Sequence, residues 1–351
     1  MKNYIQCLAN LKASQQSNKS SGIYRWLILM LILFVESIAV HAQIAPVTFP
    51  NGGFHIDGNL ISNTPTSGVG DWVSGSGTGG FVFNNDGSSV NPLRSQLFID
   101  AYDSNADLTF QGGKYNDDPN TWTWSASKAS GKNDINNVMY HMASDLSNDM
   151  WIILGADRFT TTGSSYIDFE FLQNSLTRNA SFGFNSAGPQ GGRTINDILI
   201  SVEYSNGGSV ATVRFYLWKP FGTGYKYIEQ TIPSSTAFAI TNSSTVSVPF
   251  GAFGSTSYNP YQFVETAVNI TNLFGSFDPC LSLTVNSVIV KTKASASESA
   301  SLGDFIEPIQ VSFKLGDASI SYPHNLCQIG VANVNQSGVT GGEYSASPTG
   351  L

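Results

Sequence analysis

Residues 197–218 read DILISVEYSNGGSVATVRFYLW, and this stretch decides the fold class. Its two halves are rich in β-branched and aromatic residues, and they flank Asn206-Gly207, a pair that favours the positive φ angles of a tight turn. In the second half the side chains alternate, so Val213, Phe215 and Leu217 share one face, and Arg214, Tyr216 and Trp218 share the other. The stretch therefore predicts an antiparallel hairpin.

Comparable strand patterns recur along the chain between clusters of Gly, Asn, Asp and Ser, at 80–83, 150–155, 166–172, 246–250 and 281–291. One helix is expected from Pro260 to Phe274, because Asn259 can cap it and its apolar residues fall on one stripe. Antiparallel strands with hardly any helix indicate an all-β, two-sheet sandwich of jelly-roll type with one short helix.

The N-terminus has the pattern of a secretory signal peptide. Four basic residues and no acid precede the apolar run Trp26–Val35, and Val40-His41-Ala42 places small residues where a signal peptidase reads. The ten-residue run would span about 15 Å as a helix, half of a hydrocarbon core of about 30 Å. We therefore expect residues 1–42 to be removed before Gln43, leaving no transmembrane span. An uncleaved anchor is the alternative, and Glu36 disfavours it.

Charge limits the partners of the mature chain. The whole sequence carries a net charge of −8, and the leader holds four bases and one acid, so the mature chain has 13 bases, 24 acids and a net charge of −11. This balance argues against nucleic acid, whose phosphates need a basic face. Extracellular glycans, calcium or another protein are the expected partners, and the expected location is secreted or at the cell surface.

A change of character after Pro308 suggests a domain boundary. A new strand is expected at 310–315, and the chain then ends in a stretch rich in Gly, Ser and Thr that is too short to bury a β-core alone. We expect a sandwich domain over 43–308 and the truncated start of an Ig-like domain over 309–351. Cys280 and Cys327 straddle this boundary, and in an oxidising compartment they could pair.

Four ordered segments carry a family resemblance: 110–119 leading to Trp122-Thr-Trp124, 131–137 leading to 155–159, 263–271, and 291–295 through 304–306. Together they resemble an uncharacterised N-terminal β-sandwich domain of secreted multidomain bacterial surface proteins of the Bacteroidetes type. The tail 322–351 is similar to the Ig-like repeats that follow this domain in gliding bacteria. The resemblance implies fold and location, and it brings no activity to this chain.

The strand at 166–172 holds the sharpest candidate site. Alternation places Tyr166, Asp168 and Glu170 on one face. This face resembles the active-site strand of laminarinase-like retaining glucanases, in which Asp168 would be the middle acid and Glu170 the acid/base. The nucleophile position holds Tyr166, although retaining hydrolysis needs two carboxyl groups about 5–5.5 Å apart. A glycan-binding face and a merely polar outer face are the other two readings.

Two further groups of residues are candidates for binding. Asp100, Asp103, Asn105 and Asp107, with Asp117 and Asp118 nearby, form an oxygen-rich loop of the kind that calcium prefers, although Leu108 and Lys114 rule out an EF-hand. These residues are also ordinary turn formers. Trp122 and Trp124 point the same way and can stack on a sugar, or they belong to the core.

The sequence thus predicts a secreted, non-catalytic β-sandwich module for adhesion or for recognition of a glycan or protein. No metal-binding His/Cys spacing, phosphate loop or nucleophile elbow is present in the sequence. A laminarinase-like hydrolase that uses Asp168 and Glu170 is the competing hypothesis, and a passive structural spacer is a third.

Overall fold

The computed structural model describes residues 53–62, 70–74, 80–145, 147, 149–275, 283–315, 319–321 and 335–337. The expected signal peptide (residues 1–42) and both Cys280 and Cys327 lie outside these ranges, as does most of the tail. Within them, no helix is both long and apolar enough to cross a lipid bilayer.

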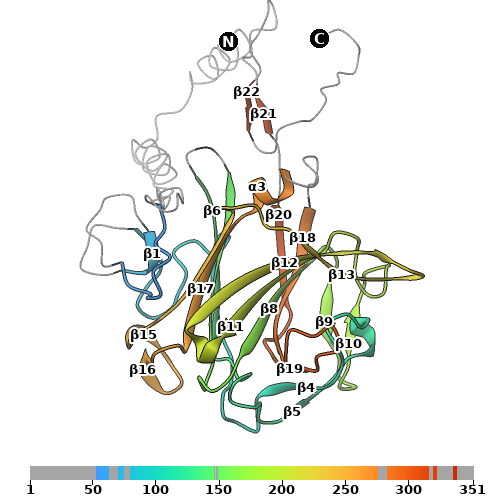
Figure 1. Cartoon of the computed structure of the whole chain (residues 1–351), viewed down its shortest axis with the longest axis horizontal. Helices are drawn as coiled ribbons and strands as arrows, with labels where there is room; N and C mark the ends of the chain where they lie inside the picture. Colours follow the sequence, from blue (N-terminus) through green and yellow to red (C-terminus); the bar gives the residue numbers. More distant parts are fainter. Residues whose placement is uncertain are drawn as a thin grey trace, which may run out of the picture. The chain divides into compact units, whose positions relative to one another are not determined.

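Two antiparallel sheets form the body of the molecule (Figure 1). The large sheet has the strand order β13 (Gly224–Gln230), β12 (Val210–Phe221), β11 (Ile198–Ser205), β8 (Ser165–Leu172), β18 (Leu283–Lys293), β19 (Leu302–Phe305), β4 (Leu108–Gly112) and β5 (Thr123–Ala126), and β20 (Ile309–Leu315) also pairs with β18. The small sheet has the order β14 (Ala237–Thr241), β17 (Phe263–Asn269), β7 (Met150–Asp157), β6 (Asn137–Ser144) and β3 (Ser95–Ile99).

The main hydrophobic core lies between the two sheets. Alternate residues of β8, Ile167, Phe169 and Phe171, pack in one cluster with alternate residues of β7, Ile152, Leu154 and Ala156. The inward residues of β11, β12, β17 and β18 join the same cluster. This arrangement confirms the all-β sandwich, because each sheet buries every second side chain against the other.

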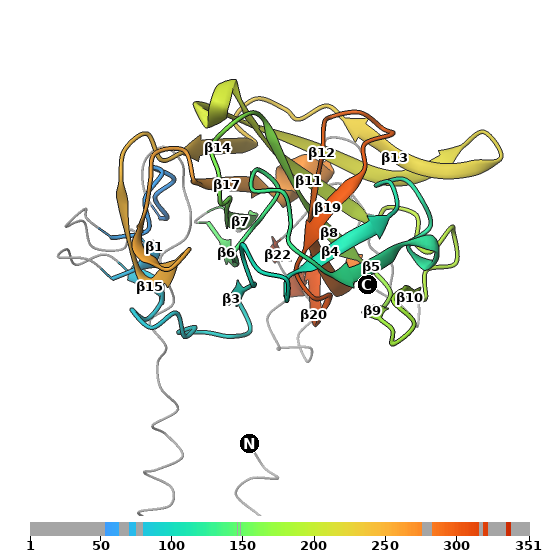
Figure 2. The ribbon, with the colours of Figure 1, turned by 90° about the horizontal axis from the view of Figure 1, so that it is seen from below.

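Both sheets are also covered on their outer faces (Figure 2). The small sheet is covered by the parallel pair β1 (Gly70–Val73) and β2 (Gly80–Phe83) and by the hairpin β15 (Val246–Ala252) and β16 (Ser255–Tyr258). The large sheet is covered by the segment around Trp122, which includes the 3-10 turn η1 (Pro119–Thr121), and by the hairpin β9 (Leu176–Arg178) and β10 (Phe184–Ser186). Polar residues on the outer faces are therefore buried as well.

The strands predicted from alternation are confirmed. The hairpin of β11 and β12 turns at η2 (Asn206–Gly208), where Asn206 and both glycines have positive φ. The helix predicted over 260–274 is wrong for most of its length, since residues 263–269 form β17, and only Ile270–Gly275 is helical, as α3. All seven residues of β17 are buried, and a strand covered on both faces has no polar alternation to distinguish it from a helix.

Strand β20 continues the large sheet, although the predicted boundary falls directly before it. It pairs with β18 from Leu283↔Leu315 to Val288↔Ile309, and Leu315 is fully buried in the main core. Farther along, β21 (Ser319–Ser321) and β22 (Asn335–Ser337) form a separate two-stranded pair. The first strand after Pro308 thus belongs structurally to the sandwich.

We predict that Leu315→Ala lowers the free energy of unfolding by about 2–5 kcal/mol, because it removes a buried side chain and leaves a cavity in the main core. Ser312→Ala, at an exposed position of the same strand, is the matched control and will change stability by less than about 0.5 kcal/mol. Urea unfolding of the two variants measures the difference. Equal stabilities would mean that β20 contributes no core packing.

Candidate functional site

The acidic strand face is buried. Asp168 and Glu170 lie on the outer face of β8, as predicted, but neither is exposed, because the segment around Trp122 and the β9–β10 hairpin cover that face. Both carboxylates are 0% exposed, so this face is not open to solvent. A ligand outside the protein has no contact with these two side chains.

Glu170 is held in a network of ion pairs. Arg193 donates from Nε to Oε1 of Glu170 at 2.5 Å, Lys291 donates to Oε2, and the Tyr227 hydroxyl donates to Oε1 at 2.8 Å. Burial alone would raise the pKa of Glu170, but the charges of Arg193 and Lys291 together hold it at about 2. This carboxylate is ionised at every physiological pH.

Asp168 has its own partner on the neighbouring strand. Lys293 donates to both of its carboxylate oxygens, at 2.6 and 2.9 Å, and to the hydroxyl of Ser201 at 3.1 Å. The register brings this about, since Lys291 and Lys293 of β18 lie opposite Asp168 and Tyr166 of β8. Two acids are thus buried together with three bases, which are Lys291, Lys293 and Arg193.

Aromatic rings enclose the buried charges. The guanidinium carbon of Arg193 lies 4.6 to 5.2 Å from the ring centroids of Trp218, Tyr227 and Trp122. Trp122 is 1% exposed and donates its Nε1–H to a backbone carbonyl, so it is a core residue. Such rings attract a cation through their negative faces. They help to offset the cost of burying the three bases.

The five predicted binding residues do not form an open face. Tyr166 and Trp124 are half-buried, and Arg178 stacks over the Trp124 ring at 4.1 Å. Asp168, Glu170 and Trp122 are buried, and Trp124 packs against the hydrophobic cluster that contains Trp122. The five residues therefore share no exposed surface that could bind a sugar.

The predicted calcium loop contributes to a different polar cluster. One oxygen each of Asp100, Asp107 and Asp304 lie within 4.8 Å of one another. Asp134 lies beside them, because its charge acts on both Asp100 and Asp304, and it accepts a hydrogen bond from the N–H of Asp103 at 3.0 Å. Within the described residues, none of these four acids forms a salt bridge. We call them the four-aspartate cluster.

Crowding and burial perturb these acids strongly. Burial and the charge of Asp107 raise the pKa of Asp100 to about 7. Burial likewise raises the pKa of Asp134 to about 7, and burial and Asp107 raise that of Asp304 well above its usual range. The charge of Lys128 opposes this rise at Asp134, but like charges still crowd one small volume.

Two residues of the predicted calcium set lie outside the four-aspartate cluster. Asp103 is exposed and pairs with Lys128, and Asn105 is exposed. Asp117 and Asp118 are used elsewhere, at the backbone of Lys114 and at the start of η1. The members that the sequence did not reveal, Asp134 and Asp304, come from distant segments, and neither has a local signal beyond being an aspartate.

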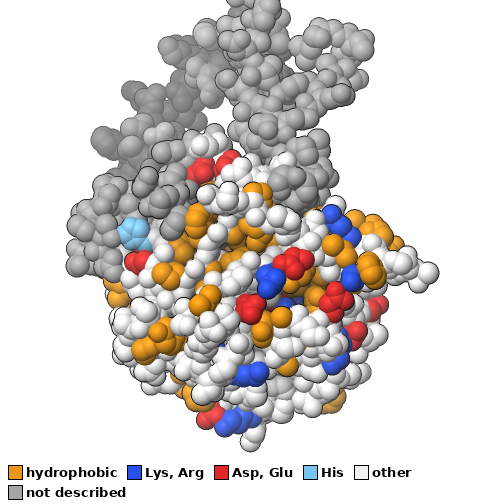
Figure 3. Space-filling model, viewed as in Figure 1, with side chains coloured by type: hydrophobic (Ala, Val, Ile, Leu, Met, Phe, Trp, Pro, Cys, Tyr) orange, Lys and Arg blue, Asp and Glu red, His pale blue; other side chains and the backbone are white. Residues whose placement is uncertain are grey.

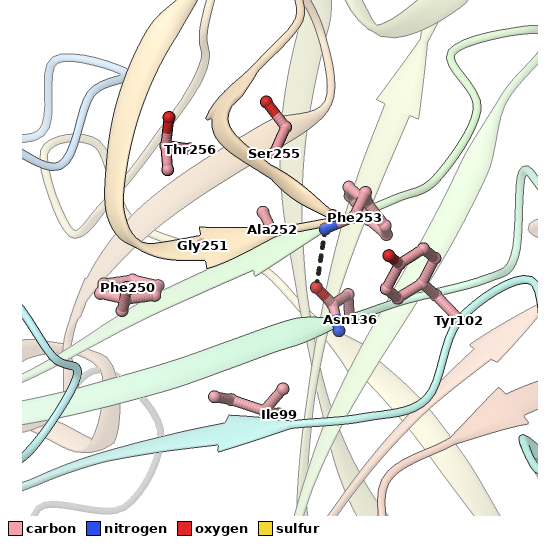
Figure 4. A pocket seen from close by; sticks show the side chains of 10 residues that line it. Ile99, Tyr102, Asn136, Phe250, Gly251, Ala252, Phe253, Ser255 and Thr256 are labelled. Carbon is pink, nitrogen blue, oxygen red and sulfur yellow. Dashed lines mark hydrogen bonds between the residues drawn. The ribbon is translucent and has the colours of Figure 1, made fainter.

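A pocket of about 600 Å³ opens beside this loop (Figure 4). Its walls come from the end of β3, the loop after it, and the β15–β16 hairpin, and they include the rings of Tyr102, Phe250 and Phe253, the amide of Asn136 and the hydroxyls of Ser255 and Thr256. The ten lining residues include no acid, lysine, arginine or histidine. No pattern in the sequence pointed to this pocket.

The pocket has a fixed backbone. Phe253 has φ of 50°, in the left-handed region that side chains rarely adopt, and its N–H donates to Oδ1 of Asn136 at 2.9 Å (Figure 4). The neighbouring Gly254 also has positive φ, and a Cβ there would meet the Tyr102 hydroxyl at 2.9 Å. Strained residues persist where their surroundings over-determine them, often at binding sites.

We predict that Glu170→Gln lowers the free energy of unfolding by about 3–5 kcal/mol at pH 7, because it leaves Arg193 and Lys291 buried without a counter-charge. Since the folded pKa of about 2 lies below the unfolded value, the contribution of Glu170 persists above pH of about 4.5 and fades as the pH falls toward 2. The difference from the unsubstituted chain should shrink over that range in urea unfolding.

Glu229→Gln is the control for this prediction, since Glu229 pairs with Arg214 at the surface. It should cost less than about 1 kcal/mol. A Glu170→Gln cost as small as this, or one that stays constant from pH 5 to pH 2.5, would contradict the network.

Comparison with known proteins does not identify the chain. No family model matches it, and no curated protein or solved structure does either. The function is therefore argued from the geometry of the described residues.

Proposed function

We propose that the chain is a non-catalytic recognition module of a secreted or cell-surface protein, and that it binds an uncharged glycan in the pocket beside Tyr102. The observation that carries this proposal is the lining of the pocket, which combines aromatic rings with amide and hydroxyl groups and lacks charge. Sugars present apolar ring faces and many hydroxyls, so they suit such a surface. The leader pattern and the family resemblance support the location.

The rings are positioned for stacking. Tyr102, Phe250 and Phe253 are half-buried, so each keeps part of its surface open, and the Tyr102 and Phe253 centroids are 5.3 Å apart in an edge-to-face pair. Ile99 at the rim is 64% exposed. The face seen in Figure 3 carries mostly uncharged side chains, with acids and bases in small groups, and this face does not favour a strongly charged ligand.

The surroundings of Glu170 support a non-catalytic module over the competing hydrolase. A general acid must hold a proton near neutral pH, but the pKa of Glu170 is about 2. Its two oxygens are engaged by Arg193, Lys291 and Tyr227, and its side chain is not exposed. A laminarinase-like hydrolase would need this carboxyl group protonated and open to the substrate.

We predict that the purified chain binds oligosaccharides on a glycan array, and that Tyr102→Ala and Phe250→Ala each weaken binding to the strongest hit by at least tenfold. Loss of a stacking ring costs about 1–1.5 kcal/mol or more, which corresponds to that factor. Phe221→Ala removes a more exposed ring, 57% accessible, at the far hairpin of β12 and β13, and it is the control outside the pocket. Titration calorimetry measures each affinity.

The same preparation separates the alternatives. Incubation with laminarin and mixed-linkage glucans should release no reducing ends. Turnover that Glu170→Gln abolishes would establish the hydrolase, and the absence of both turnover and array binding would favour a passive spacer. Binding that survives both pocket substitutions would place the recognition surface elsewhere.

A further inference from the structure

The four-aspartate cluster is a concentration of negative charge. None of its acids forms a salt bridge with a described residue, although the charge of Lys128 acts on Asp134. We propose that Asp100, Asp107 and Asp304 bind one Ca²⁺ ion beside Asp134, and that this ion fixes the loop of residues 100–107. The ion binds independently of any glycan. Its effect on the pocket rests on the proposed function and is tested separately below.

The spacing of the oxygens fits a single ion. Calcium ligands lie about 2.3–2.6 Å from the metal, so two oxygens on opposite sides are about 5 Å apart. One oxygen each of Asp100, Asp107 and Asp304 lie within 4.8 Å of one another. One ion can therefore contact all three, and the remaining positions are open to backbone carbonyls and water.

Unpartnered oxygens point independently to a missing cation. Asp134 is 0% exposed, yet its Oδ1 has no hydrogen-bond partner, and Oδ2 of Asp100 also has none. A buried carboxylate oxygen without a partner is costly. Elsewhere in this chain the buried acids Asp168 and Glu170 are satisfied by Lys293, Lys291 and Arg193. In the four-aspartate cluster a metal ion supplies the positive charge that the lysines and the arginine supply to Asp168 and Glu170.

The donor set selects the metal. All the side chains of the cluster offer carboxylate oxygens, and no His or Cys belongs to it. Hard oxygen donors from flexible loops favour Ca²⁺, whereas Zn²⁺ prefers nitrogen and sulfur ligands, and Mg²⁺ keeps several of its waters. Lys128, the base nearby in the sequence, pairs with exposed Asp103 at the surface.

The cluster is connected to the pocket through Asn136. Its Nδ2 donates to the carbonyl of Asp100 at 2.6 Å, and its Oδ1 accepts the N–H of Phe253 at 2.9 Å. Tyr102 lies on the loop between Asp100 and Asp107, and the next residue, Asp103, donates to Asp134. An ion that fixes this loop also fixes two rings of the pocket.

The first test is calorimetric titration of the full-length chain with CaCl₂ after treatment with EDTA. We expect one Ca²⁺ per chain, and an affinity at least tenfold lower for Asp304→Asn and for Asp107→Asn. Asp86→Asn alters an exposed acid outside the cluster and should leave the affinity unchanged. No binding by the unsubstituted chain, or equal affinity in all three variants, would overturn the proposal.

Asp100→Asn separates metal binding from a structural role. An amide keeps the oxygen that accepts the N–H of Ala101, and it replaces the unpartnered oxygen with a donor. The melting temperature in EDTA should therefore equal or exceed that of the unsubstituted chain, whereas in 5 mM CaCl₂ it should be lower by several degrees. The same change in both buffers would show that the acids serve packing alone.

The link to the pocket has its own measurement. If the array identifies a glycan, its affinity for the chain should fall at least tenfold in EDTA and recover with added Ca²⁺. Calcium binding without this dependence would leave the ion site standing and reject its coupling to the pocket. Failure of glycan binding alone would not alter the result of the calcium titration.

Discussion

The burial of charge under the outer layer of the large sheet constrains the rest of the structure. Glu170 and Asp168 sit in the middle of β8, and their neutralisation requires Lys291 and Lys293 on β18 and Arg193 on a covering loop. A shift of β18 by one residue would turn both lysines into the main core. The ion pairs and the hydrophobic alternation therefore specify the same register.

Because the outer sheet faces are covered, the side chains that a ligand can reach lie away from these faces. Many β-sandwiches keep one sheet face open to solvent, but here both outer faces carry a second hydrophobic layer. The loop after β3 and the β15–β16 hairpin stay accessible, and the pocket lies there. The two polar clusters differ accordingly, since one is balanced by bases and closed, and the other is acidic and lies next to the pocket.

Residues 197–218 show how well local pattern predicts this fold, because one face of each strand is apolar and the turn is chemically distinct. Residues 263–269 show where it stops, because burial on both faces removes the alternation. The pairing of Asp168 with Lys293 had a faint signal, an Asp-x-Glu strand and a Lys-x-Lys strand of opposite charge. The approach of Asp304 to Asp107 had none, since only the tertiary fold joins them.

The central position of β18 also determines when the sheet can be completed. Lys293 follows Asp168 by 125 positions, so a chain that emerges from its N-terminus must hold Asp168 without this partner until nearly all of the sandwich has been made. Contacts this far apart in sequence form late and slowly, because a long loop must close first. A polypeptide with this order of assembly stays unfolded during synthesis for longer than one built from local hairpins.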